Sequence, residues 1–485
     1  MQFLKVNSWL LLAGALFIAL SSWFLWHDQV YFYALPLVLG GIYIAVFHTK
    51  LTFLLLFLFT PLSVNIEEFT DGFGLFIPTE PLLFGLMVLL LAQHIKYGVF
   101  PEFVWKNAIT YAIGFYLFWV FFTSVTSQYP LVSFKFLLAR LWFIIPVLLY
   151  GSRVFLSEKN IRTFIWLFTI GMVIVMVYTV LLHATYRFGE KESHWVMWPF
   201  FKDHTIYGAM VAFLVPLLFG LYFSKKHPPL VQAVLLAFMV INLVALYFSY
   251  TRAAWLSIVA ALGVWVLIHF RVRFSLLAGV TVAAGIVIFF SWTSIEQSLS
   301  KNKSEHTTED FGKRLESAAN VTTDASNLER INRWSCAIEM FRERPVLGFG
   351  PGTYAFEYAR FQKPENLTII STNFGDGGNA HSEYLGPLAE MGFMGLIAIL
   401  LIISAIFYKG ITLYNRWPSG QKEMKALILA MILALVTYFV HGILNNYLDT
   451  DKAAVPIWAI CACFIALEYK LNTGQREMTG ESKAK

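Results

Sequence analysis

Charged residues are scarce in this chain, and their scarcity bounds its class. Of its 485 residues only 14% are Asp, Glu, Lys or Arg, whereas 58% are hydrophobic. This balance excludes an ordinary soluble globular protein, which carries more charge and less apolar surface. We therefore predict an all-α polytopic membrane protein with about 12–14 transmembrane helices and one large, partly helical loop outside the membrane.

Cysteine is also nearly absent, with Cys336, Cys461 and Cys463 as the only three. Two of them fall in the last apolar segment, so neither a disulfide framework nor a thiolate metal site is expected. The chain has no Walker motif, and its external segments hold no compact group of acids and histidines at metal-ligand spacing. We therefore expect no cofactor and no bound metal.

Long apolar segments are what the chain has in abundance. Those long enough to span a membrane lie near 8–26, 30–47, 51–64, 81–96, 108–126, 131–150, 161–183, 205–223, 229–249, 254–270, 274–292, 386–408, 424–446 and 452–469. The third is the weakest, because Pro61 shortens it. We expect residues 1–292 to form a bundle of about eleven spans. Residues 293–385 would be an external loop region, 386–470 the C-terminal spans and 471–485 a cytoplasmic tail.

Lysine and arginine set the expected orientation. With a cytoplasmic N-terminus, basic residues such as Lys96, Arg153 and Arg271 collect in the inner loops, whereas Glu67 and Glu68 lie in an outer turn. The net charge of +6 is then mainly a topology signal, and no nucleic-acid partner is expected. The first segment is too long for a signal peptide, so we expect no cleaved leader.

The junction at residues 379–387 is the strongest candidate for chemistry. It places Asn379, His381, Glu383 and Tyr384 where the external loop meets an apolar segment. A site there is wet on one side and held rigidly on the other. Histidine also titrates near physiological pH, so it can move protons.

Two cations stand in the sixth apolar segment, where charges are costly unless they face a cavity or a partner. Lys135 is close enough to the outer surface to snorkel to it. Arg140 lies deeper, so we favour a functional role for it.

A third candidate is Arg252, in the very short outer turn between the ninth and tenth segments. Its guanidinium keeps its charge and can bind two phosphate oxygens at once, which suits an anionic ligand. The alternative is an arginine that anchors a helix end at lipid headgroups.

Aromatic residues are concentrated in the outer loop 184–204, as in an interfacial belt. The same loop would also suit a groove for a lipid-linked substrate. Lys202 and His204, at the head of the next segment, are its candidate site residues.

The external region divides into two parts. Residues 296–327 are polar and predict loose structure. Residues 328–341 carry apolar side chains at helical spacing and include Arg330, so they predict an amphipathic helix. A glycine turn at 348–352 and a short helix at 354–361 are expected to follow.

Three of these features together resemble the O-antigen ligase and polymerase superfamily of bacterial membrane glycosyltransferases. Arg252 is followed four residues later by Leu256, as in the family's outer arginine motif. His381-Ser382, nine residues, Gly392, two residues and Gly395 is similar to its histidine signature. The segment from Arg330 to the glycine turn is similar to its loop helix. The resemblance covers roughly residues 200–400.

The resemblance implies transfer of a glycan from an undecaprenyl-pyrophosphate carrier to an acceptor hydroxyl. The acceptor would be a lipid such as lipid A-core, a glycan or a protein, at the periplasmic face of the bacterial inner membrane. Arg252 and Arg330 are then the candidates to bind the donor pyrophosphate, with Arg140 and Lys202 beside them. His381 would be the catalytic base. Asn379, Glu383, Tyr384 and His204 would orient it or contact the acceptor.

Several alternatives remain open from the sequence. Leu396 stands where ligases commonly have Ser or Thr, and the expected span count exceeds their usual twelve. Both differences leave a ligase, a polymerase of O-antigen or exopolysaccharide, and a protein O-oligosaccharyltransferase as candidates. A transporter or flippase of lipid-linked sugars is an alternative of another class, although it would keep charges near the membrane midplane. A sensor or scaffold is a more distant one.

Overall fold

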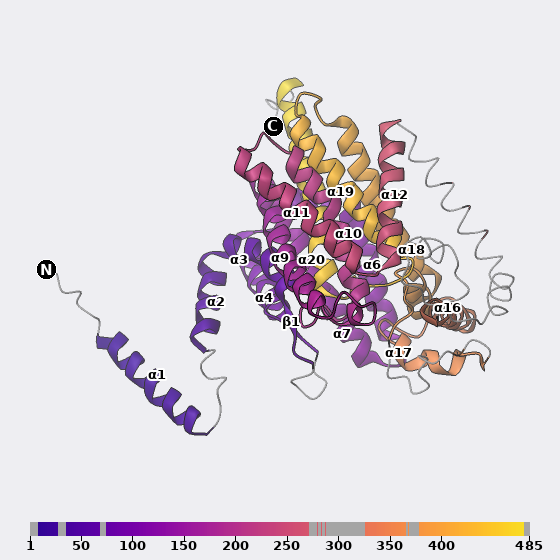
Figure 1. The fold of residues 1–485 in the computed structure, drawn as a ribbon, viewed down its shortest axis with the longest axis horizontal. Helices are drawn as coiled ribbons and strands as arrows, with labels where there is room; N and C mark the ends of the chain where they lie inside the picture. Colours follow the sequence, from indigo (N-terminus) through magenta and orange to yellow (C-terminus); the bar gives the residue numbers. More distant parts are fainter. Residues whose placement is uncertain are drawn as a thin grey trace. The chain divides into compact units, whose positions relative to one another are not determined.

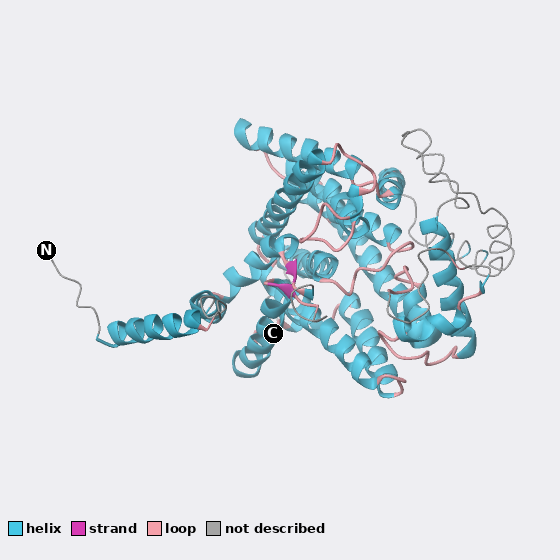
Figure 2. Ribbon diagram, turned by 60° about the horizontal axis from the view of Figure 1, so that its bottom comes forward, coloured by secondary structure: helices cyan, strands magenta, loops and turns pink. Residues whose placement is uncertain are grey.

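The computed structural model describes residues 8–27, 35–67, 74–270, 279, 283, 287, 325–364, 367 and 378–479. Helices account for nearly all the regular structure in these ranges (Figure 2). The strands described are β1 (Val64–Asn65) and β2 (Phe76–Ile77), which pair antiparallel with Val64 opposite Ile77. The prediction of an all-α polytopic membrane protein is confirmed.

The chain forms two compact units, Met1–Phe53 and Leu54–Lys485. The first contains α1 (Ser8–Trp26), α2 (Leu35–Phe47) and the beginning of α3 (Thr49–Leu62). Large apolar side chains such as Leu16 and Trp26 are exposed on α1. A helix that is apolar on all its faces is typical of a lipid environment.

The second unit is a helix bundle with short links (Figure 1). Apart from the segment between α12 and α18, the elements described in it are as follows: α4 (Thr79–Tyr97), α5 (Glu102–Trp105), α6 (Ala108–Val125), α7 (Pro130–Ile144), the π-helix η3 (Ile145–Tyr150), α8 (Gly151–Val154), α9 (Glu158–Thr185), the 3-10 turn η4 (Glu192–His194), α10 (His204–Phe223), α11 (Pro229–Phe248), α12 (Arg252–His269), α18 (Leu385–Arg416), α19 (Lys422–His441) and α20 (Asp451–Thr479).

Within the described ranges, nine helices are long and apolar enough to cross a membrane. They are α6, the continuous stretch Pro130–Val154, α9 to α12, α18, α19 and the Asp451–Gly474 part of α20. Three shorter apolar helices lie at Gly14–Trp26, Val38–Phe47 and Thr49–Leu62. Each predicted span coincides with a helix except 274–292, most of which lies outside the described residues.

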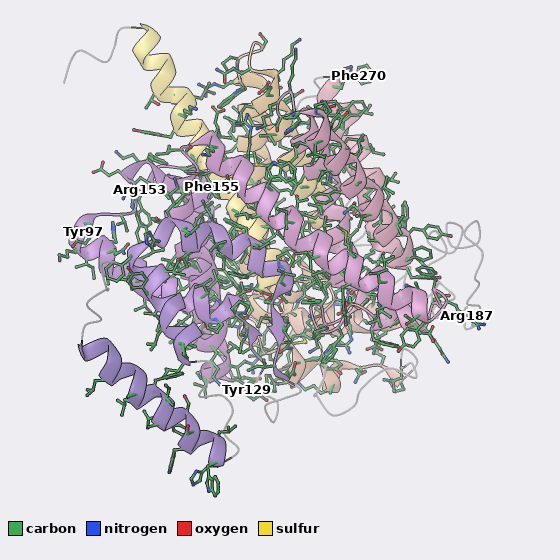
Figure 3. All side chains as sticks on the ribbon, turned by 60° about the vertical axis from the view of Figure 1, so that its left-hand side comes forward. Tyr97, Tyr129, Arg153, Phe155, Arg187 and Phe270 are labelled. Atoms are coloured by element: carbon green, nitrogen blue, oxygen red, sulfur yellow. The ribbon has the colours of Figure 1, made fainter. Side chains whose placement is uncertain are left out.

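The two ends of the bundle carry different loops. Figure 3 labels Tyr129, which precedes α7, and Arg187, which follows α9, toward one end. Arg153 and Phe270 lie toward the other. This alternation is the one that the lysine and arginine pattern predicts, although which end faces the cytoplasm stays a prediction.

A polar cap fixes the start of α10, and a side-chain contact ties it to the start of α12. The Oδ1 atom of Asp203 accepts hydrogen bonds from the backbone N–H groups of Thr205 (2.8 Å) and Ile206 (3.1 Å). The Oγ1 hydroxyl of Thr251 donates to the carbonyl of His204 (2.8 Å). A Cβ on Gly208 would lie 2.6 Å from that of Thr251, so glycine permits this close approach. The first turns of α10 and α12 are therefore held together.

The external segment folds into a small helical layer. It consists of α16 (Ala325–Glu343), a glycine turn, α17 (Tyr354–Glu357) and the 3-10 turn η5 (Tyr358–Phe361). The predicted helices at 328–341 and 354–361 are confirmed. Of the segment 296–327, predicted to be loosely structured, residues 296–324 lie outside the described part of the chain, and the prediction is wrong for 325–327, which form the first turn of α16. Cys336 and Phe349 belong to its buried core. Burial raises the pKa of the Cys336 thiol to about 12, so this cysteine stays protonated and packs as an apolar group.

The glycine turn docks on a kink in α18. Gly392 has φ 68° and ψ −168°, and a Cβ there would lie 2.2 Å from the carbonyl oxygen of Val346. The backbone N–H of Phe393 donates to the carbonyl of Pro345 (2.9 Å), and that of Gly350 donates to the carbonyl of Glu390 (2.8 Å). Glycine at 392 is thus required by backbone conformation and by contact. This packing joins the loop helix to the membrane helix that follows His381.

Candidate functional site

The candidate site lies where the first turns of α10 and α12 meet α16 and two loops. One loop is the junction 378–384 before α18, and the other is the turn 442–450 between α19 and α20. In Figure 1, α12, α16 and α18 lie on the same side of the bundle. Segments distant in sequence therefore supply one set of polar side chains, which we call the outer cluster: Asp203, His204, Arg330, His381, His441, Asn445 and Tyr447.

His381 is held in an unusual backbone conformation. Its φ is 47°, a left-handed value that non-glycine residues rarely adopt. Its N–H donates to Oδ1 of Asn379 (3.0 Å), and its carbonyl accepts from Nε1 of Trp334 on α16 (3.3 Å). The imidazole is hydrogen-bonded to the side chain of Asn445. Two contacts thus fix the backbone of His381 and a third holds its ring, as expected for a side chain that must meet a substrate in one orientation.

The surroundings keep this imidazole neutral. Burial lowers the pKa of His381 to about 4, and the positive charges of Arg333 and Arg330 add to the effect. Asp203 and the bond to Asn445 oppose it. At neutral pH the ring is therefore unprotonated and has a nitrogen able to accept a proton.

Arg330 is the electrostatic centre of the outer cluster. This half-buried residue of α16 interacts with the titrating groups of His381, His204, His441 and Tyr447. Its guanidinium and the carboxyl group of Asp203 are the charged side chains of the outer cluster, and a guanidinium can bind two phosphate oxygens at once. Such a site favours an anionic ligand.

Arg252 begins α12 beside the same place. It is half-buried, and the bond from Thr251 to the carbonyl of His204 fixes its backbone next to the first residue of α10. The structure thus brings the predicted residues Arg252, His204, Arg330 and His381 to the same end of neighbouring elements.

Two more histidines, His204 and His441, belong to the outer cluster. The ring of His204 lies 4.1 Å from that of His194, measured between centroids. His441, the last residue of α19, is 1% exposed, and neither ring nitrogen has a hydrogen-bond partner in the described part of the protein. Buried polar atoms are normally paired, so an unpaired imidazole here is consistent with a place that a ligand completes.

Sequence reasoning missed His441, Asn445 and Tyr447. They lie more than fifty residues beyond the junction, around a turn whose position depends on the packing of α19 against α10. The signal that could have found His441 is a histidine at the outer end of an otherwise apolar segment.

Arg333 ties the junction to α16. Its Nε donates to Oε1 of Glu329 (2.8 Å), and its Nη1 donates to the carbonyl of Asn379 (3.2 Å). A Cβ on Gly378, whose φ is 89°, would lie 2.3 Å from that Nη1. The arginine is thus clamped between the helix and the loop that carries His381, and it was not among the predicted site residues.

The predicted orienting residues hold the loops in place. Oε1 of Glu383 accepts hydrogen bonds from the hydroxyl of Tyr438 (2.5 Å) and from the N–H groups of Tyr447 (2.6 Å) and Leu448 (2.9 Å). Burial raises the pKa of Glu383, and these donors partly offset the rise. The hydroxyl of Tyr384 donates to the carbonyl of Phe439 (2.9 Å). Glu383 therefore fixes the turn that carries Asn445, and Asn379 supports the backbone of His381.

Arg140 and Lys202 have different surroundings from Arg330. Arg140 is 7% exposed, donates from Nη1 to the carbonyl of Leu448 and interacts with Asp449 and Glu383. Lys202 is 70% exposed and forms an ion pair of 3.5 Å with Glu67. Neither contacts the outer cluster through a described hydrogen bond or ion pair, so their assignment to the donor pyrophosphate stays a prediction.

Among the residues that the structure describes, no group of three or more His, Cys, Asp or Glu side chains is arranged to hold a metal ion. The cations at this site are instead guanidinium groups. Metal-independent catalysis therefore stays a prediction that a chelation experiment can test.

Residues 237–400 match the family model described as O-antigen ligase. This match confirms the resemblance to the O-antigen ligase superfamily, and it includes Arg252, Arg330 and His381. A protein of Haemophilus influenzae named only as an uncharacterized protein is 25% identical over 139 residues. The alignment covers 28% of this chain and 33% of that relative. This chain thus spans about a third of the relative's length, and the relative's name carries no activity.

Proposed function

We propose that this protein transfers a glycan from an undecaprenyl-pyrophosphate carrier to an acceptor hydroxyl at the periplasmic face of the inner membrane. The acceptor of an O-antigen ligase-like enzyme would be lipid A-core or a similar molecule. An O-antigen or exopolysaccharide polymerase, or a protein O-oligosaccharyltransferase, would use the same donor chemistry with another acceptor.

One observation carries this proposal. Arg330 and His381 are electrostatically coupled in the outer cluster, and Arg252 starts a helix fixed to His204 beside it. All three motif residues lie within the matched range. A transporter would not require this combination at one end of the bundle, because its charged residues must serve both access states near the midplane.

The chemistry can be written with these groups alone. The acceptor oxygen attacks the anomeric carbon, the bond from that carbon to the pyrophosphate oxygen breaks, and the electron pair leaves with the lipid pyrophosphate. Arg252 and Arg330 would stabilise the charge that grows on the leaving group. His381 would take the proton from the acceptor hydroxyl, and Asn445 would hold the imidazole in a single orientation.

Donor binding would also adjust His381. In the ligand-free protein its pKa is about 4, which makes a neutral but weak base. A bound pyrophosphate would counter the field of Arg330 and Arg333 and so raise that pKa toward the working pH, where a general base is most effective. Binding of the donor would thus make His381 a stronger base for the proton of the acceptor hydroxyl.

The experiment that tests this function is transfer by purified protein from a defined lipid-linked donor to several candidate acceptors. We expect Arg330→Ala to lower the rate by on the order of 100- to 1,000-fold, as when a donor to a growing negative charge is removed. Arg342→Ala removes an exposed arginine of the same helix and is the matched control. Equal rates for Arg330→Ala and Arg342→Ala would contradict the proposal, as would the absence of transfer to every acceptor by the parent protein.

A further inference from the structure

A cavity of about 330 Å³ lies on the other side of the junction from the outer cluster. Asn379, Ala380, Ser382 and Glu383 line it, whereas His381 between them does not. The volume falls in the lower range of small-molecule sites. The junction thus borders two compartments, and the residues on either side of His381 form a wall of the second.

The polar end of this cavity differs from the outer cluster in its charge. Its charged lining consists of Arg140 together with the carboxyl groups of Glu383, Glu390 and Asp449. The charge of the single guanidinium is offset by its interactions with Asp449 and Glu383, so this end of the cavity offers a pyrophosphate little positive charge. The lipid pyrophosphate is therefore a poor fit here, and a neutral ligand with many hydroxyl groups is a good one.

The three carboxyl groups differ in whether the protein already donates hydrogen bonds to them. Glu383 accepts from the amides of the 442–450 turn, and Glu390 accepts from the backbone N–H groups of Gly352 (2.9 Å) and Tyr354 (3.0 Å). Asp449 is an exposed residue that lines the cavity and interacts electrostatically with Arg140. It is thus the carboxyl group best placed to receive hydrogen bonds from a ligand's hydroxyl groups.

Three lining residues carry further unused polar atoms. Nε of Arg140, Oδ1 of Asn446 and Nε1 of Trp458 are buried and have no hydrogen-bond partner within the described ranges. Small side-chain rotations would let them meet a ligand that both donates and accepts. Tyr116 and Phe136 supply aromatic rings beside these atoms, and the Arg140 guanidinium lies over the Phe136 ring, 4.3 Å from its centroid, so the ring of Tyr116 is the one suited to the C–H face of a sugar. Hydroxyl-rich ligands need this mixture of donors, acceptors and aromatic faces.

We infer that this cavity binds a sugar of the acceptor, with Asp449 and Arg140 as its hydroxyl-binding groups. The inference rests on the proposed glycan transfer, and it assigns the acceptor to one side of the junction and the donor pyrophosphate to the other. Arg140 then binds the acceptor, which differs from the donor role predicted from the sequence. A sugar of the donor glycan has the same chemistry, so the test must distinguish the two sources.

The test combines kinetics and direct binding on purified protein. Asp449→Asn keeps the size of the side chain but removes its charge, and we expect the KM for the acceptor to rise roughly tenfold, as for the loss of one charged hydrogen bond. The donor KM should stay unchanged. Glu102→Gln, an exposed carboxylate on α5, is the matched control and should alter neither constant.

Each other outcome overturns the inference. A rise in the donor KM alone would place the donor glycan in the cavity, and unchanged constants would exclude a sugar contact at Asp449. Titration of the parent protein and of Asp449→Asn with the delipidated acceptor oligosaccharide separates this inference from the proposed function. Binding that Asp449→Asn weakens supports the cavity even if no transfer is found, whereas equal binding by both proteins contradicts it.

Discussion

Two cation sites in this protein, one around the buried Lys452 and one around the half-buried Arg330, are built in opposite ways. Near the start of α20, Nζ of Lys452 donates to the carbonyls of Thr60 (2.8 Å), Pro61 (3.2 Å) and Ser63 (2.7 Å) and to the Ser63 hydroxyl (2.6 Å). Asp451, its neighbour, accepts from that hydroxyl (2.6 Å). This lysine site, comprising Thr60, Pro61, Ser63, Asp451 and Lys452, satisfies the ammonium with protein atoms.

The outer cluster is less complete. Nδ1 of His204, both ring nitrogens of His441 and Nδ2 of Asn445 have no hydrogen-bond partner in the described part of the chain. The protein thus satisfies the Lys452 ammonium with its own atoms, with only Oδ1 of Asp451 lacking a described partner there, whereas several polar atoms around Arg330 and His381 stay unused. Because unpaired buried polar groups are costly, this difference separates a site that holds the fold together from a site prepared for a ligand.

The largest expected effect on folding belongs to the lysine site. Lys452→Met would leave Asp451 and three carbonyls without their buried partner, and such a broken pair typically costs about 3–5 kcal/mol of unfolding free energy. Thermal unfolding in detergent should show a much lower midpoint. Lys470→Met removes a half-exposed lysine paired with Glu158 and should change the midpoint little. Equal midpoints for the two variants would remove the distinction drawn here.

Substitution of Arg252 is expected to lower activity strongly without lowering stability. Arg252→Ala should lower transfer by on the order of 100-fold or more, because a charge facing the leaving group is lost. Arg252→Lys keeps the charge but loses two-point binding of phosphate oxygens, so an intermediate rate and weaker donor binding are expected. Both Arg252 variants should have the same thermal unfolding midpoint as the parent protein. A lysine variant as active as the parent would reduce Arg252 to a general surface charge.

The pH dependence of kcat/KM and of kcat compares His381 in the free protein with His381 in the donor complex. The pKa of His381 is lowered to about 4, so kcat/KM, which reports on the free protein, should stay constant as the pH falls from 7 to about 5. It should decrease only below that, when the imidazole becomes protonated. The acidic limb of kcat should appear at higher pH, because the bound donor raises the pKa. Profiles for kcat and kcat/KM with the same acidic limb would show that the donor charge does not reach His381.

Lys202 should give the smallest effect. Its exposed ion pair with Glu67 is of the kind that contributes about 0–1 kcal/mol. Lys202→Ala should therefore change the equilibrium constant for unfolding by less than about fivefold, and the transfer rate by less than about fivefold. A loss as large as that of Arg252→Ala would mean that Lys202 reaches the donor despite its position.

The sequence predicted features whose signal is local. Helical spacing located α16, and the junction with His381 was apparent because polar residues adjoin an apolar segment. The role of Glu383 was not predictable, since its bonds go to a turn about sixty residues later. Arg140 was recognised as unusual, but the carboxyl groups around it come from the junction before α18, from α18 itself and from the 442–450 turn. Such long-range packing leaves no periodic pattern in the sequence.

The measurement that tests the central claim most directly separates donor binding from transfer in His381→Ala. Loss of a positioned base typically lowers the rate by on the order of 100- to 10,000-fold, whereas donor binding, assigned to Arg252 and Arg330, should persist. His269→Ala, at the opposite end of α12 from Arg252, is the matched control. In one detergent preparation we expect normal donor affinity and almost no product for His381→Ala. Near-normal transfer by this variant would contradict the account.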